Sequence, residues 1–212
     1  MKKRLFVALM LDPSLCELVH QSVRLALEPA AGGRRALEPG APHLAAPLRL
    51  VDPGGLHLTL AFLGEVGEAR IPSLVEHLRE GLHGLRAPSL ALGATGSFPG
   101  RGHERVLWVG LVEQEAGGLA GVHGRVCSAL AAGGFELEGE QGFVPHLTVA
   151  RVRRGPGVPR TLVPDLFYGL RFEQDWHPHR VCLVESVPSG VHGRPPRYEI
   201  LAEFPVGECA PE

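Results

Sequence analysis

The pentapeptide His-Leu-Thr-Leu-Ala at residues 57–61 returns as His-Leu-Thr-Val-Ala at residues 146–150. The chain contains 11 histidines and only four threonines, so chance alone would give about 0.2 His-x-Thr pairs in a sequence of this length. Two copies that also agree in the residues around them indicate an internal repeat. A chain with this repeat is expected to fold into two related halves, each carrying one copy of the motif.

Both copies lie in sequence that is typical of strands. Residues 56–63 alternate with a period of two, so that the histidine and the threonine share one face and the leucines share the other. Residues 143–150 repeat the pattern, and Pro145 marks the beginning or an edge of that strand. If the two strands lie side by side about a pseudo-two-fold axis, four polar side chains meet in one pocket. These side chains are His57, Thr59, His146 and Thr148.

The remaining pattern predicts an α+β protein with few helices and many strands. A helix is expected from Ser14, as its N-cap, to about Glu28, and two more carry apolar residues at helical spacing in 71–82 and 119–130. Residues 29–47 are crowded with Pro, Gly and Ala and predict a flexible surface insertion. Further strands are expected at 4–11, 89–94, 105–112, 168–172, 180–187 and 198–204.

The composition is typical of a single compact globular domain. The chain has 212 residues, and its apolar fraction of 44% and charged fraction of 21% lie near globular averages. The apolar run near the N-terminus is short, is followed at once by Asp12 and Pro13, and is too short to span a membrane, so it predicts a strand rather than a signal peptide. Four cysteines lie far apart in the sequence and predict reduced thiols in the cytoplasm.

The net charge limits how the protein can bind nucleic acid. A charge of −2 and a pI near 6.6 exclude a polycation that grips long nucleic acid through many phosphates. Any contact with RNA is therefore expected to be local.

The paired motifs suit an in-line displacement at phosphorus. Attack by water needs a neutral imidazole to accept a proton, and departure of the opposite oxygen needs an imidazolium to supply one. Histidine offers both forms near neutrality because its unperturbed pKa is about 6.5. Thr59 and Thr148 would donate hydrogen bonds to the non-bridging oxygens. This scheme requires neither a metal nor a cofactor, and neither motif has the H-x-H or H-E-x-x-H spacing typical of metal ligands.

The sequence around the motifs resembles the two-histidine (2H) phosphoesterase superfamily, and within it the bacterial and archaeal RNA 2′,3′-cyclic phosphodiesterases that are often called 2′-5′ RNA ligases. The similarity runs almost from end to end. It is carried by RLFVAL at 4–9, LHLTLAFLGEV at 56–66, RVLWVG at 105–110, FVPHLTVAR at 143–151 and PRYEILAEFPV at 196–206. The chain departs from the family at Leu50, where a tryptophan is often found, and in residues 29–47.

The resemblance implies a fold and a reaction. The fold is bilobal, with two pseudo-symmetric antiparallel sheets that form a central cleft and helices on the outside. The reaction is hydrolysis of a 2′,3′-cyclic phosphate to a 2′-phosphomonoester, with His57 as general acid, His146 as general base and the 3′ oxygen leaving. The implied partners are RNA ends or nucleoside 2′,3′-cyclic phosphates, with no membrane and no obligatory protein partner, and the protein is expected to be a monomer.

Three further residues are candidates for substrate contacts. Arg151 and Phe62 occupy equivalent places in the repeat, and strict alternation points both away from the pocket. A bulge would turn Arg151 back, and the family pattern favours a phosphate or substrate role for it. Phe62 is interpreted as a core residue rather than as a base-stacking platform, and Tyr198 is kept as a candidate. The other histidines are interpreted as surface or structural residues, including His20, His77, His103, His123 and His177.

Other functions remain open from the sequence. The same site could act as a 2′-5′ RNA ligase on RNA or tRNA-half ends, or as a nucleotide-binding module without turnover. A metallohydrolase is the weakest alternative because the metal-ligand spacings are missing.

Overall fold

The computed structural model describes residues 1–28, 48–100, 102–138, 142–152, 157–189 and 196–207. The expected insertion at 29–47 lies outside these residues. The helices are α1 (Pro13–Leu27), α2 (Ile71–Leu82), α3 (Gly118–Ala132) and α4 (Asp165–Gly169). The strands are β1 (Lys2–Met10), β2 (Leu48–Leu50), β3 (His57–Gly67), β4 (Leu90–Phe98), β5 (His103–Glu104), β6 (Val106–Glu113), β7 (His146–Val152), β8 (Val158–Pro159), β9 (Asp175–Trp176), β10 (Arg180–Val187) and β11 (Arg197–Pro205).

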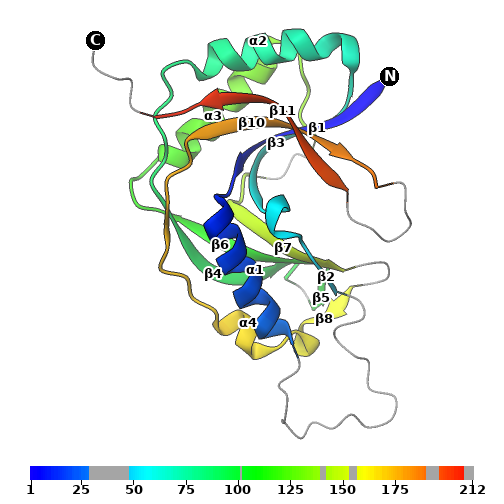
Figure 1. Cartoon of the computed structure of the whole chain (residues 1–212), viewed down its shortest axis with the longest axis vertical. Helices are drawn as coiled ribbons and strands as arrows, with labels where there is room; N and C mark the ends of the chain where they lie inside the picture. The colour runs from blue at the N-terminus through cyan, green and yellow to red at the C-terminus, as the bar shows by residue number, and fades with distance from the viewer. Residues whose placement is uncertain (29–47, 101, 139–141, 153–156, 190–195, 208–212) are drawn as a thin grey trace, which may run out of the picture.

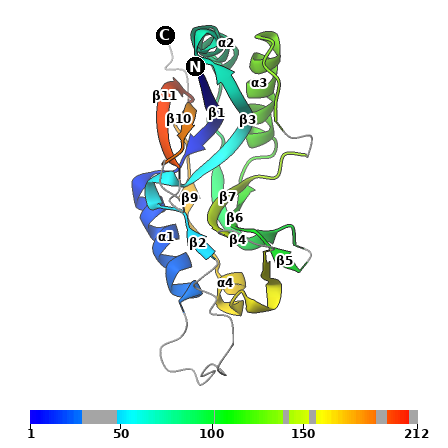
Figure 2. The ribbon, with the colours of Figure 1, turned by 90° about the vertical axis from the view of Figure 1, so that its right-hand side faces the viewer.

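Within the described residues, nine of the strands form one curled antiparallel sheet (Figures 1 and 2). The strand order is β11-β10-β1-β3-β7-β6-β4-β9, with β2 paired to β7, while β5 and β8 form a separate small sheet. The order divides at its centre into two equivalent halves that meet where β3 pairs with β7. The α+β fold of two pseudo-symmetric halves is thus confirmed. The two expected sheets are, however, continuous with each other, through the register pair Leu58–Leu147.

The helices cover the outer face of this sheet. Two of them, α1 and α3, pack against the half of the sheet opposite to the one that contains the strand before them. Helix α1 follows β1 of the first half but packs with α4 against the second half, whereas α3 follows β6 of the second half and packs with α2 against the first (Figure 2). The core lies between these helices and the outward side chains of the strands, where Leu58, Leu60 and Leu147 are buried. The predicted alternation of the motif strands is therefore confirmed, because these leucines face the core.

Two local expectations differ from the structure. Helix α1 begins at Pro13, with Asp12 as its N-cap and no side-chain capping bond, so Ser14 is not the cap. Proline suits this first helical position because its missing N–H is one of the donors that a helix start leaves unpaired. Residues 168–172 are not a strand: a helical turn ends at Gly169 and buries Phe167, whose carbonyl accepts a hydrogen bond from Thr95.

The helices and the cysteines also bear on what the sequence predicts. No helix in the described part of the chain is long and apolar enough to cross a bilayer. Cys16, Cys127 and Cys182 are free thiols, as expected, while Cys209 lies outside the described residues.

Replacing Leu147 by alanine should lower the free energy of unfolding by about 2–5 kcal/mol, because it removes a fully buried side chain at the junction of the halves and leaves a cavity. Urea unfolding measures the change. Replacing Leu25, an exposed leucine of α1, should change the free energy by less than about 0.5 kcal/mol. A Leu147→Ala protein as stable as the wild type would contradict the importance of this junction.

Candidate active site

The two motifs meet on the inner face of the sheet, at the junction of the halves. The antiparallel pair Leu58–Leu147 sets the register of β3 and β7. One step along each strand, this register places His57 across from Thr148 and His146 across from Thr59. Each threonine therefore lies across from the histidine of the other motif. The four polar side chains that the sequence pairs through the repeat are brought together.

Both imidazoles are held in the same way. His57 Nδ1 lies 2.7 Å from the carbonyl oxygen of Gly55, and His146 Nδ1 lies 2.8 Å from that of Val144. A carbonyl oxygen only accepts, so each Nδ1 carries the hydrogen and donates it. In both cases the partner is the residue two positions earlier in the chain. The bonds fix the orientation and tautomer of each ring and leave Nε2 of both histidines available for a ligand.

The aromatic surroundings of the two rings differ. Phe6 lies 4.8 Å from the His57 ring, between centroids, and Tyr198 presents its edge at 5.1 Å. His146 is contacted edge-on by Phe98 at 5.1 Å. His57 is therefore the more enclosed of the two. The sequence pattern identified neither Phe6 nor Phe98 as part of the site, since both are ordinary apolar strand residues.

This enclosure changes the acidity of the histidines. Burial, with smaller contributions from the charges of Arg151 and His146, lowers the pKa of His57 to about 4, although the bond to Gly55 opposes the change. Burial and then Arg151 also lower the pKa of His146. Both imidazoles are therefore neutral at pH 7 without a ligand. A bound anion would counter the effect of Arg151 and favour the imidazolium form.

A bulge follows each motif and turns the next polar or aromatic residue inward. The pairing shifts by one residue at Leu60 in β3 and at Val149 in β7. Because each bulge adds a residue, Phe62 and Arg151 return to the face of the histidines. The expectation from strict alternation is therefore wrong for both residues. Phe62 is 46% exposed, so its interpretation as a core residue is also wrong.

Arg151 and Phe62 lie beside the motifs. Nη2 of Arg151 lies 3.5 Å from the hydroxyl of Thr148, to which it donates. Phe62 lines two cavities, of which one includes Gly55 and Tyr198, the neighbours of His57, and the other includes His146. Tyr198 contacts the His57 ring and lines the first cavity with Phe62 and Arg151, while Thr59 and His146 line the second.

The two cavities are chemically different. The first, of about 550 Å³, is lined by four arginines together with Tyr198 and Gly55. We call it the arginine cavity, and its arginines are Arg4, Arg49, Arg151 and Arg197. The second, of about 890 Å³, is lined mainly by apolar and aromatic side chains, and we call it the apolar cavity. Its lining includes Thr59, His146, Phe98, Leu137, Phe143 and Val144.

Other histidines have local partners. His20 is hydrogen-bonded to the carbonyl of Val51, and His77 to that of Ser73. His123 lines the apolar cavity and stacks on Phe143, with ring centroids 4.1 Å apart. Within the described residues, no three or more His, Cys, Asp or Glu side chains form a group that could hold a metal ion.

In the ligand-free protein, the ring signals of His57 should titrate near pH 4 in an NMR titration. Arg151→Gln should raise the pKa of both His57 and His146, because the positive charge of Arg151 disfavours their protonation. Saturating inorganic phosphate should raise the pKa of His57 in the wild type. Titration of His57 near its unperturbed value of about 6.5, unchanged by the substitution, would contradict this description of the site.

Comparison with known proteins agrees with this geometry. The family model of the 2′-5′ RNA ligase superfamily matches residues 44–188. The RNA 2′,3′-cyclic phosphodiesterase of Thermus thermophilus is 38% identical over 166 residues, which cover 73% of each chain. That of Archaeoglobus fulgidus is 32% identical over 71% of this chain and 73% of its own.

Solved structures share the fold. The crystal structure of TT0787 of Thermus thermophilus superposes with a TM-score of 0.71 at 24% identity, over 97% of this chain and 98% of that one. Escherichia coli LigT complexed with 3′-AMP gives a TM-score of 0.69 at 24% identity, over 97% and 99%. The paired motifs, the sheet and these similarities lead to one conclusion: the chain belongs to the 2′-5′ RNA ligase superfamily of two-histidine phosphoesterases.

Proposed function

We propose that the protein is an RNA 2′,3′-cyclic phosphodiesterase, which opens a terminal cyclic phosphate to a 2′-phosphomonoester. The observation that carries the proposal is the matched pair of imidazoles, each with Nδ1 bonded to a backbone carbonyl and Nε2 available at one cleft. The relatives named RNA 2′,3′-cyclic phosphodiesterase, at 32–38% identity, support the same activity. The substrates would be RNA ends or nucleoside 2′,3′-cyclic phosphates.

The positions of the side chains support the following reaction. With the phosphate between the histidines, His146 Nε2 accepts a proton from water as the water oxygen bonds to phosphorus. The bond from phosphorus to O3′ breaks on the opposite side, and His57 Nε2 donates its proton to that oxygen. Thr59, Thr148 and Arg151 donate hydrogen bonds to the non-bridging oxygens, where negative charge accumulates.

The surroundings of His57 support its assignment as the acid. The cyclic phosphate is an anion, and its binding beside His57 stabilises the imidazolium that the ligand-free site disfavours. Once protonated, an imidazolium held among Phe6 and Tyr198 gives up its proton readily to the departing oxygen, because the enclosed site favours the neutral ring. His146 is less enclosed and lies beside the apolar cavity, from which water or another hydroxyl can approach.

The apolar cavity favours 2′-5′ ligation as a second candidate function. Phe62, Leu137 and Val144 are exposed apolar side chains in its lining, and bases stack readily on such surfaces. A 5′-hydroxyl RNA end placed there would replace water beside His146. Its oxygen would bond to phosphorus as O3′ leaves, which yields a 2′-5′ phosphodiester.

His57→Ala and His146→Ala should each lower kcat/KM for adenosine 2′,3′-cyclic phosphate by about 10²-fold or more, measured in excess chelator. His77→Ala is the matched control, since this histidine lies on α2 and lines neither cavity, so its loss should leave the rate unchanged. Retained activity in either motif variant would contradict the mechanism. Tight binding by the wild type without any product would instead indicate a nucleotide-binding module.

Leu137→Asp should lower the ratio of ligated to hydrolysed product when RNA with a cyclic phosphate end is mixed with 5′-hydroxyl RNA. The substitution puts a negative charge where the second RNA strand would bind and removes an apolar contact. Leu166→Asp is the matched control, because Leu166 is also exposed but does not line the cavity. Sequencing gels that resolve 2′-5′ junctions measure the ratio. An equal ratio in both variants would exclude the apolar cavity as the acceptor site.

A further inference from the structure

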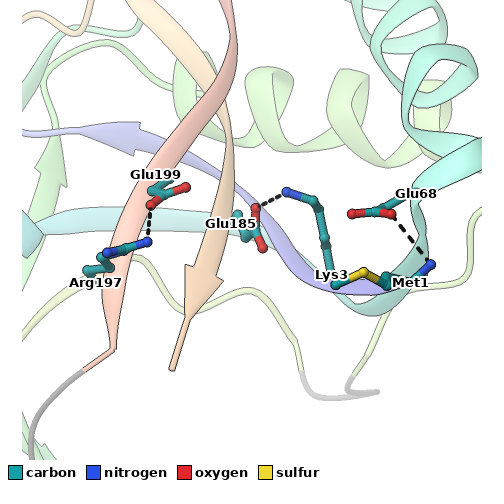
Figure 3. A network of polar contacts seen from close by, with 6 residues as sticks. All are labelled: Met1, Lys3, Glu68, Glu185, Arg197 and Glu199. Atoms are coloured by element: carbon teal, nitrogen blue, oxygen red, sulfur yellow. Dashed lines mark hydrogen bonds and ion pairs between the residues drawn. The ribbon is translucent and has the colours of Figure 1, made fainter. Parts of the chain in front are cut away.

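The arginine cavity is lined by more arginines than one reacting phosphate needs to contact. Its four arginines come from four strands, β1, β2, β7 and β11. Arg197 pairs with Glu199 at 2.8 Å along β11 (Figure 3), and Arg4 pairs with Glu138 at 3.4 Å. In contrast, Arg151 forms no ion pair with a carboxylate in the described part of the chain. Asp52 is the one acidic residue among those that line the cavity.

Arg49 and Arg151 form a pair of like charges. They lie directly opposite each other where β2 pairs with β7, and both line the cavity. Like charges at directly opposite strand positions destabilise a sheet. Burial lowers the pKa of Arg151, and the charge of Arg49 lowers it further. Anions bound beside these guanidinium groups would weaken the repulsion, so the pair indicates that phosphate groups bind here, one beside Arg49 and the reacting one beside Arg151.

The cavity lies on the side of the cleft where the ribose would be. Gly55, which holds His57, and Tyr198, which contacts its ring, are both in the lining. The motif histidines and threonines are not themselves among the lining residues, so it is Gly55 and Tyr198 that connect the cavity to His57. In the proposed reaction O3′ leaves toward His57, so the sugar and whatever is attached to its 5′ carbon extend into this cavity. Its volume of about 550 Å³ is within the range of ordinary nucleotide-sized sites.

We infer that the arginine cavity binds the phosphate on the 5′ side of the terminal nucleoside, through Arg49 and Arg197. The substrate is then an RNA strand, or a nucleotide with a 5′-phosphate, in preference to an unphosphorylated nucleoside cyclic phosphate. Arg151, which donates to the hydroxyl of Thr148, would contact the reacting phosphate. The inference rests on the proposed function, because that function sets the direction in which the ribose points.

The test compares adenosine 2′,3′-cyclic phosphate with and without a 5′-phosphate. The wild type should show a kcat/KM about tenfold higher for the 5′-phosphorylated substrate, since a charge-assisted contact is gained. In the double variant Arg49→Gln, Arg197→Gln this preference should fall to about one. Arg180→Gln is the matched control, because Arg180 is an exposed arginine of β10 that does not line the cavity. It should keep the wild-type preference.

Calorimetric binding provides a readout that does not depend on turnover. Adenosine 2′,5′-bisphosphate should bind the wild type about tenfold more tightly than adenosine 2′-monophosphate, and added salt should reduce the difference. Equal affinities in a wild type that hydrolyses the cyclic phosphate would overturn the inference and leave the proposed function intact. So would an equal loss for both substrates in the double variant, which would place Arg49 at the reacting phosphate. A wild type that hydrolyses neither substrate would refute the proposed function, and the two affinities would still decide the role of the cavity.

Discussion

The pairing of Leu58 with Leu147 brings the two histidine motifs of this protein together. It is the register contact between two halves that otherwise form their own strand ladders, and both side chains are buried in the common core. Because the strands are antiparallel, one contact is enough to bring His57 and His146 to the same cleft from distant parts of the chain. The two histidines therefore occupy equivalent positions because the strands that carry them are related by the symmetry of the sheet.

The symmetry of the backbone does not extend to the surroundings. Both rings donate Nδ1 to a carbonyl two residues earlier, yet Phe6 and Tyr198 enclose His57 while His146 borders a large cavity. Equal groups in unequal environments have different proton affinities, and this difference is what acid–base catalysis requires. The cavities near the two histidines differ in the same way: the one near His57 is lined by arginines, and the one that includes His146 is mainly apolar.

Much of this arrangement could be predicted from the sequence. The repeat and its alternation predicted both motif strands, the buried leucines and the meeting of the four polar side chains, because period-two burial depends only on neighbouring residues. The positions after the motifs could not be predicted, since the bulges at Leu60 and Val149 arise from pairing with β1 and β6. The arginine cavity could not be predicted either. Arg4, Arg49 and Arg197 are far apart in the sequence and come together only when their strands join the same sheet.

The exchange of helices between the halves also bears on how the molecule can be divided. Helix α1 leaves the half in which it begins and shields the other, and α3 does the reverse. A cut between the two motifs would separate α1 from β7 and α3 from β3. Each fragment would then expose apolar strand residues that a helix of the other fragment covers. We therefore expect that neither piece would fold alone and that separated fragments would regain a stable state only by reassociating.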